Sequence, residues 1–110
     1  MDKTHPPVSL AAARKLSWKP GRSAEVFIDG EMEIRFTGQP TKGMQVPHDR
    51  DEFYIVASGT ARYRVEELVT EVGPGDLLFA AAHAPHGFED YSDDFAIWIG
   101  FYGPVKQKPL

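Results

Sequence analysis

The sequence contains 110 residues, with 12 Lys or Arg, 16 Asp or Glu, four His and no Cys, and its formal net charge is −4. The absence of Cys excludes a disulfide scaffold, a thiolate zinc site, an iron–sulfur cluster and a cysteine nucleophile, so any metal ion must be held by His nitrogens and carboxylate oxygens. An acidic chain is a poor ligand for nucleic acid, and we predict no such partner.

The N-terminal segment contains the only predicted helix. Residues 1–7 lack the apolar core of a signal peptide, so we expect a cytoplasmic protein. Residues 8–16 follow two prolines and are rich in Ala and Leu, which favours a short helix there. The longest apolar runs, 77–82 and 95–102, are far shorter than the roughly 20 residues of a membrane-spanning helix, and we expect no membrane partner.

The rest of the chain is a series of short β-rich runs separated by turn residues. Asp29-Gly30 between two such runs is a strong hairpin signal. Without long helices between them, these strands cannot form a parallel sheet, which predicts an antiparallel sandwich or a closed barrel. The predicted strands cover residues 24–28, 32–37, 44–48, 52–57, 60–65, 68–72, 77–80, 87–89 and 95–101.

Two of the predicted strands are apolar on both faces. Residues 53–56 and 95–99 contain almost only apolar side chains, so one face of each strand would line the interior and the other would be covered by a second sheet or subunit. Because the chain is also small, this pattern favours a homodimer. The large side chains Phe79, Phe88, Trp98 and Phe101 are predicted to belong to the core.

Candidate ligand side chains lie four residues apart in the stretch 47–59. Side chains alternate along a strand, so His48 and Glu52 would point to the same face if the chain were continuously extended between them. Tyr54 has the same parity, and its phenol could orient a metal-bound water or a substrate. A second stretch, 73–90, predicts a turn, a buried strand and then His86 at the entry to another strand.

These two stretches resemble the two motifs of the cupin family. The first motif has two His separated by one residue, then three or four residues, Glu, six residues and Gly. The pattern His48-x3-Glu52-x6-Gly59 is similar to its second half. In the second motif, Gly75 and His86 match in place, whereas Ala81, His83 and Asp90 replace Pro, Gly and Asn.

The resemblance covers about residues 24–104 and implies a double-stranded β-helix, or jelly-roll barrel, with a metal near its mouth. Residues 1–23 would form an N-terminal arm with the short helix, and residues 105–110 a loose C-terminal tail. The family's first motif His falls on Val46, so the implied ligand set is reduced to His48, Glu52 and His86. Two His and one carboxylate suit Fe(II) and also accommodate Mn, Ni or Zn.

Several residues keep two interpretations. His83 lies three residues before His86 and is either a ligand or catalytic base at the barrel mouth or a loop residue that faces water. Gln45 has the wrong parity to replace the missing His unless Pro47 introduces a bulge. The triad itself is either a working metal site or the remnant of one, although a Glu facing an apolar barrel is costly unless a cation or a proton accompanies it.

The cupin resemblance implies two functions from different classes. The first is a metal-dependent enzyme of the dioxygenase, isomerase or cyclase type that acts on a small organic molecule, with Tyr54 and His83 as candidate catalytic residues. The second is a non-catalytic module that binds a small molecule or serves as an accessory protein, with a degenerate metal site. The fold by itself does not select the reaction.

Overall fold

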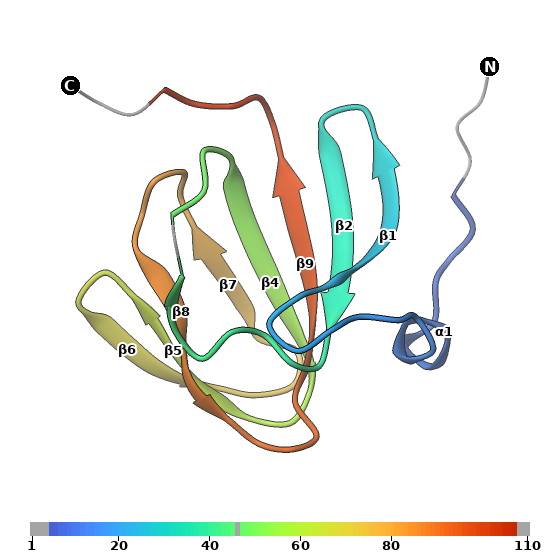
Figure 1. The fold of residues 1–110 in the computed structure, drawn as a ribbon, viewed down its shortest axis with the longest axis horizontal. Coiled ribbons are helices and arrows are strands. Elements are labelled where there is room, and N and C mark those ends of the chain that lie inside the picture. The colour runs from blue at the N-terminus through green and yellow to red at the C-terminus, as the bar shows by residue number, and fades with distance from the viewer. Residues whose placement is uncertain (1–4, 46, 108–110) are drawn as a thin grey trace.

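The computed structural model describes residues 5–45 and 47–107. Val46, predicted to occupy the position of the first motif His, lies outside the described residues. Within these ranges the chain forms one helix and nine strands (Figure 1). The helix is α1 (Leu10–Arg14). The strands are β1 (Ala24–Asp29), β2 (Met32–Thr37), β3 (Gly43–Gln45), β4 (Asp51–Ser58), β5 (Ala61–Val65), β6 (Leu68–Val72), β7 (Leu77–Ala80), β8 (His86–Tyr91) and β9 (Ala96–Tyr102).

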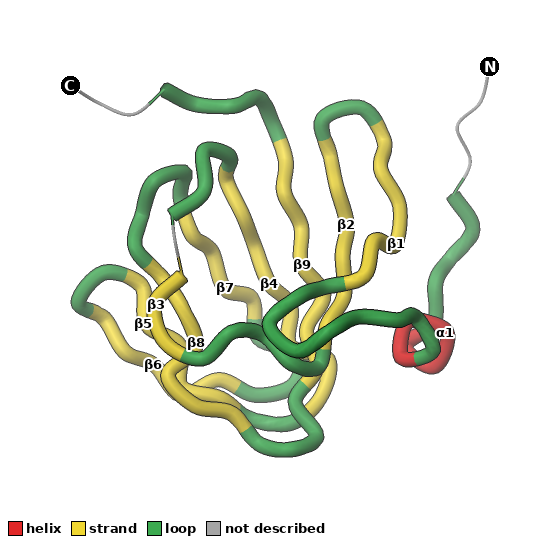
Figure 2. Tube along the Cα trace, in the orientation of Figure 1, coloured by secondary structure: helices red, strands yellow, loops and turns green. Residues whose placement is uncertain are grey.

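The strands form two antiparallel sheets that face one another (Figures 1 and 2). One sheet has the order β1-β2-β9-β4-β7, and the other has the order β3-β8-β5-β6. The prediction of an all-β antiparallel fold built from short strands is therefore confirmed. The largest difference is in β3, which ends at Gln45 instead of continuing to His48.

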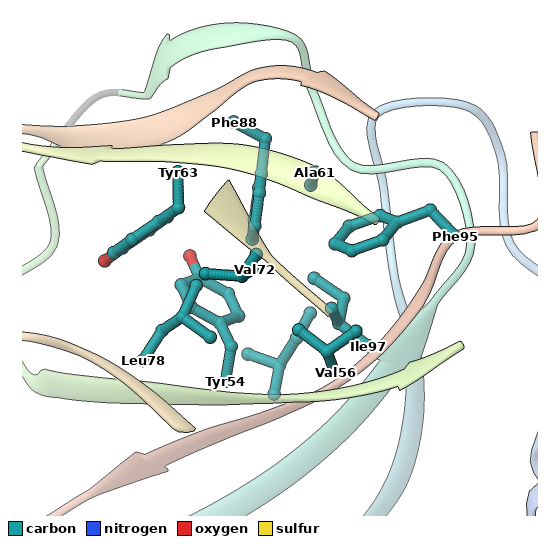
Figure 3. Packing of buried hydrophobic residues seen from close by; sticks show 10 residues of the cluster. Tyr54, Val56, Ala61, Tyr63, Val72, Leu78, Phe88, Phe95 and Ile97 are labelled. Atoms are coloured by element: carbon teal, nitrogen blue, oxygen red, sulfur yellow. The ribbon is translucent and has the colours of Figure 1, made fainter. Parts of the chain in front are cut away.

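The core lies between the two sheets and is rich in aromatic rings. Phe88 of β8 is fully buried and makes edge or tilted ring contacts with Tyr54, Tyr63 and Phe95, at centroid distances of 5.2 to 5.3 Å. Figure 3 shows Phe88 pointing from its own sheet toward Tyr54 and Val56 on the other. This contact across the interior ties the two sheets together.

Helix α1 covers the outer face of the larger sheet near β2 and β9. Its Ala13 packs in a second buried cluster with Phe36 and Ala96, and Trp98 packs against that cluster. The hydroxyl of Ser9 accepts a hydrogen bond from the Ala12 amide and caps the start of the helix. Among the described residues, no helix combines the length and apolar character needed to cross a membrane.

The outer face of β4 and β7 is not covered by any of the residues that the structure describes. Phe79, predicted to lie in the core, is 48% exposed, and Leu77 is 72% exposed. The prediction for Phe79 was wrong because Leu78 and Ala80, its neighbours of opposite parity, take the inward positions on β7.

Candidate metal centre

Three predicted ligands meet at one end of the interior. Glu52 and His86 are buried, at 3% and 1% exposure, whereas the His48 side chain is 37% exposed. The carboxylate oxygen Oε1 of Glu52 lies 2.9 Å from Nε2 of His86 and 3.5 Å from Nε2 of His48. Donor atoms that share an ion at about 2.0–2.2 Å are separated by roughly 3–4 Å, so these distances fit ligands of one metal ion.

His48 reaches this point from a loop and not from a continuous strand. Residues 47–50 lie between β3 and β4, so the condition of continuous extension on which the parity argument rested is not met. The bend through residues 49 and 50 brings the imidazole back over Glu52, the second residue of β4. The rings of His48 and Phe101 of β9 form a T-shaped contact, with centroids 5.2 Å apart.

A second hydrogen bond orients the His86 ring. Its Nδ1 lies 2.9 Å from the carbonyl oxygen of Ala84, so Nδ1 carries the proton and Nε2 faces Glu52. Histidine ligands of metals commonly hold their second nitrogen in this way. In neutral His86 the Nε2 lone pair would then meet a carboxylate oxygen, and two acceptors at this distance require a cation or a proton between them. The residues present therefore fit a bound metal ion.

Without an ion, a proton can take the same place. Burial lowers the pKa of His86, but the hydrogen bond with the Glu52 carboxylate and the one with Ala84 raise it, and the net direction is upward. The same attraction for positive charge that binds a proton at this position would hold a divalent cation.

Gly87 allows β3 to approach β8 beside this site. A Cβ atom at position 87 would collide with the backbone carbonyl of Gly43. The close approach sets a register in which Gln45 lies opposite His86. Gln45 lines the same cavity as His48 and Glu52, so its predicted wrong parity does not keep it away from the site.

Tyr54 contributes a buried hydroxyl next to the triad. The side chain is 1% exposed, and its hydroxyl makes no hydrogen bond of good geometry with the described residues. Burial raises the pKa of Tyr54 well above its ordinary value, and the neighbouring Glu52 carboxylate raises it further. The phenol therefore keeps its proton and is available as a hydrogen-bond donor to a ligand.

His48, Glu52 and Tyr54 line a cavity of about 260 Å³, and His86 lies beside it in contact with Glu52. Ile97, Ile99 and Phe101 of β9 supply the apolar part of its wall. Arg35 of β2 also lines the cavity and was missed in the sequence. The charged residues Glu33 and Arg35 alternate with apolar residues along the strand, which could have indicated that both point to one side. A strand face exposed to solvent shows the same alternation, so the pattern did not identify Arg35 as a cavity residue.

His83, the other predicted catalytic residue, lies outside the cluster of ligand atoms. Its Nε2 is 2.6 Å from the backbone carbonyl of Lys106, and its amide donates to the carbonyl of His48. His83 also has a φ of +69°, which is uncommon for a residue with a side chain. The structure thus joins the loop before His86 to the loop that carries His48.

The C-terminal segment is held against both loops, so the prediction of a loose tail is wrong at Lys106. The Lys106 amide donates to the carbonyl of Asp49, and its ammonium lies 2.6 Å from the Asp51 carboxylate. Asp51 also accepts a hydrogen bond from the Ala82 amide. Lys106 and this amide together lower the pKa of Asp51, which is buried.

Comparisons with known proteins agree with this architecture. An uncharacterized protein of Streptomyces coelicolor is 34% identical over 64 residues, which are 58% of this chain and 61% of that protein. The chain thus matches less than two thirds of that relative's length.

Solved structures show the same fold. A Thermus thermophilus protein is 27% identical, with a TM-score of 0.61 over 81% of this chain and 90% of that chain. A cupin-2 domain containing protein from Shewanella frigidimarina is 15% identical, with a TM-score of 0.67 over 87% of this chain and 94% of that chain. The family model for the cupin domain matches residues 31–102. With these residues matched and its metal-ligand motifs brought together, the chain belongs to the cupin family.

Proposed function

We propose that this protein is a metal-dependent enzyme of the dioxygenase, isomerase or cyclase type that acts on a small organic molecule. The observation that carries the proposal is the convergence of His48, Glu52 and His86, with ligand atoms all within 4.8 Å of one another, beside a cavity of about 260 Å³ that His48 and Glu52 line. That volume lies below the range of roughly 300–1,000 Å³ found for pockets of drug-sized ligands, so the substrate is small.

Each residue of the site has a separate task in this proposal. His86, oriented by Ala84, and the buried Glu52 supply an imidazole and a negative charge. A divalent Fe, Mn, Ni or Zn ion would contribute Lewis acidity toward an oxygen of the substrate. The Tyr54 hydroxyl would donate a hydrogen bond to the bound molecule, and the apolar wall would exclude water. His83 remains a predicted general base. It could act only after its hydrogen bond with the Lys106 carbonyl breaks.

Metal content tests this proposal. The protein purified without added ions should contain about one transition metal ion per chain by plasma mass spectrometry, and H86A should contain little. Loss of one ligand of three weakens binding by more than the roughly 10–100-fold that an outer-shell change causes.

His5 provides the matched control. It lies near the N-terminus, stacked on Phe27, and H5A should retain the wild-type metal content. A wild-type protein that takes up no transition metal, even when Fe, Mn, Ni and Zn are offered singly, would remove the cofactor on which the enzyme proposal depends.

A second candidate function is a non-catalytic small-molecule-binding or accessory protein. The observation that favours it is the direct contact of His86 with Glu52 at 2.9 Å, because a proton alone can satisfy this pair. The sequence also favours this second function, because Val46 occupies the position of the first His of the cupin motif. This function predicts ligand binding that is unchanged by EDTA, whereas the enzyme requires metal.

We also propose that the protein is a homodimer that pairs through the outer face of β4 and β7. On this face Ile55, Leu77 and Phe79 are 38%, 72% and 48% exposed. β7 ends its sheet, and no described strand pairs with its outer edge. Identical apolar faces can cover one another around a two-fold axis, which is the commonest symmetry of oligomers.

A further inference from the structure

Arg35 lies in line with Tyr54 across the inner face of the larger sheet. Arg35 of β2 pairs with Ile99 of β9, and Ile99 pairs with Tyr54 of β4. Adjacent strands are about 4.8 Å apart, so the backbones of Arg35 and Tyr54 are separated by roughly 10 Å, with Ile99 between them. All three residues line the cavity. A small molecule lying over Ile99 would have the guanidinium at one end and the phenol at the other.

The guanidinium of Arg35 is held in place and is only partly used. Its Nε donates to the Ser23 hydroxyl, one Nη donates to the Ser23 carbonyl, and the other Nη donates to Glu33, at 2.7 to 2.8 Å. A guanidinium has five N–H donors, so two have no partner among the described residues. A side chain that is 25% exposed and fixed by three bonds is preorganised for a ligand.

At the end of the cavity near Arg35, away from the Glu52 carboxylate, the charge is positive. Glu33 accepts from Arg50 as well as from Arg35, each at 2.8 Å. Two guanidinium groups thus share one carboxylate, and the trio carries a net charge of +1. The exposed Arg22 also lines the cavity and adds a further positive charge.

This cluster lies close to the metal centre. Glu33 pairs with Phe101, and Phe101 pairs with the candidate metal ligand Glu52. This row lies two residues along each strand from that of Arg35 and Tyr54, so it is the next row on the same face of the sheet. Arg50 stacks on one side of the Phe101 ring, and His48 also packs on this ring. A molecule that reaches the triad is therefore within reach of Arg35.

We propose that Arg35 binds an oxyanion of the ligand, so that the substrate is a small organic anion, a carboxylate or a phosphate ester, with an apolar body that lies against Ile99. The inference rests on the proposed function in placing the substrate at the metal centre. The unused donors of Arg35 match the oxygens of such a group, and paired N–H bonds to an oxyanion are among the strong hydrogen bonds of proteins.

Benzoate and benzamide test the charge, because the two probes have nearly the same shape and differ in charge. We expect benzoate to bind at least about tenfold more tightly than benzamide by calorimetric titration, as for hydrogen bonds to a charged group. Phenyl phosphate is the third probe. Tighter binding of benzoate assigns a carboxylate substrate, and tighter binding of phenyl phosphate assigns a phosphate ester.

Substitution of Arg35 shows whether this residue is responsible. R35Q should abolish the preference for the anions, and R35K, which keeps the charge and loses the paired donors, should retain part of it. R62Q is the matched control, because Arg62 also forms an ion pair with a glutamate but is exposed on β5 and does not line this cavity. Thermal unfolding of each variant verifies that it is folded.

Two results would overturn the inference. One is equal binding of benzamide and both anions to the wild-type protein, and the other is an anion preference that persists in folded R35Q. Titrations of the metal-free and the zinc-loaded protein separate this inference from the proposed function. If the protein takes up no metal but binds anions through Arg35, the inference holds and the proposed function fails. If the protein takes up metal but shows no preference for anions, the proposed function holds and the inference fails.

Discussion

Glu33 is the residue on which the positive cluster depends. Its side chain is 20% exposed and accepts hydrogen bonds from both Arg50 and Arg35. The hydrogen bond from Arg50 lowers the pKa of Glu33 most, and the bond from Arg35 lowers it further, against the upward effect of burial. A carboxyl whose pKa falls on folding stabilises the folded state when it is ionised.

We predict that E33Q is less stable than the wild type near neutral pH and that the difference disappears in acid. The loss should be about 2 kcal/mol near pH 7, because a charged hydrogen-bond acceptor is removed from two arginines. The contribution of Glu33 is present above its unfolded pKa of about 4.3 and is lost as the pH falls through the lower folded value. Urea unfolding at several pH values measures this difference.

The control for this experiment is E25Q. Glu25 is exposed on β1 and has no ion pair among the described residues, so its substitution should leave the unfolding free energy unchanged at each pH. If the wild type and E33Q differ by the same free energy at pH 7 and pH 3, Glu33 does not contribute through its charge.

At the scale of elements, the C-terminal segment acts as a strap over two loops. Lys106 contacts Asp49 and Asp51 on one side, and His83 on the other. These contacts connect the loop that carries His48 to the loop that precedes His86. The positions of both imidazoles therefore depend on a segment more than 50 residues away from His48.

We predict that a chain ending at Gly103 is less stable than the full chain by about 2 kcal/mol, since it loses backbone hydrogen bonds worth about 1 kcal/mol each and an ion pair. Its metal affinity should also fall by roughly tenfold, as when outer supports of a metal ligand are removed. Urea unfolding and a competition assay with a metal chelator measure the two effects. A chain ending at Gln107 keeps Lys106 and is the control, and equal behaviour of both truncations would show that the strap has no effect.

At the scale of the whole molecule, the exposed apolar face of β4 and β7 predicts a dimer. Light scattering after gel filtration should give twice the chain mass of 12.3 kDa for the wild type and the single mass for F79K. A lysine at this position would place a charge within the buried interface, which is unfavourable without a partner.

L68K is the corresponding control. Leu68 is 64% exposed but lies on β6, at the edge of the other sheet, so the substitution should leave the dimer intact. Wild-type protein that elutes with the mass of one chain would contradict the proposed interface, as would dissociation of L68K to the same extent as F79K.

Much of the architecture could be predicted from local patterns. β2, β6 and β7 have the predicted bounds, and the other strands differ at their ends. Alternating side chains and turn residues such as Asp29-Gly30 are properties of a few neighbouring residues, so they can be recognised without the fold. The spacing of His48 and Glu52 likewise indicated that their side chains converge, although it did so through a conformation that the loop does not adopt.

The direction in which alternating charged residues point was decided by the tertiary structure. Glu33 and Arg35 on β2 show the same alternation as Arg62 and Arg64 on β5, but the first pair lies on the cavity side and the second pair bonds to Glu89 on the outside. The difference arises because α1 covers the opposite face of β2 through Phe36.

By itself, then, the sequence indicated the strands and their turns through residue type and short spacing, and it indicated the three metal-ligand candidates through its resemblance to the cupin motifs. Only the tertiary structure decided that Arg35 shares a cavity with Tyr54, that Lys106 straps the ligand loops and that Phe79 is exposed. These features depend on which elements pack together, and packing between segments far apart in the chain leaves no periodic pattern in either segment.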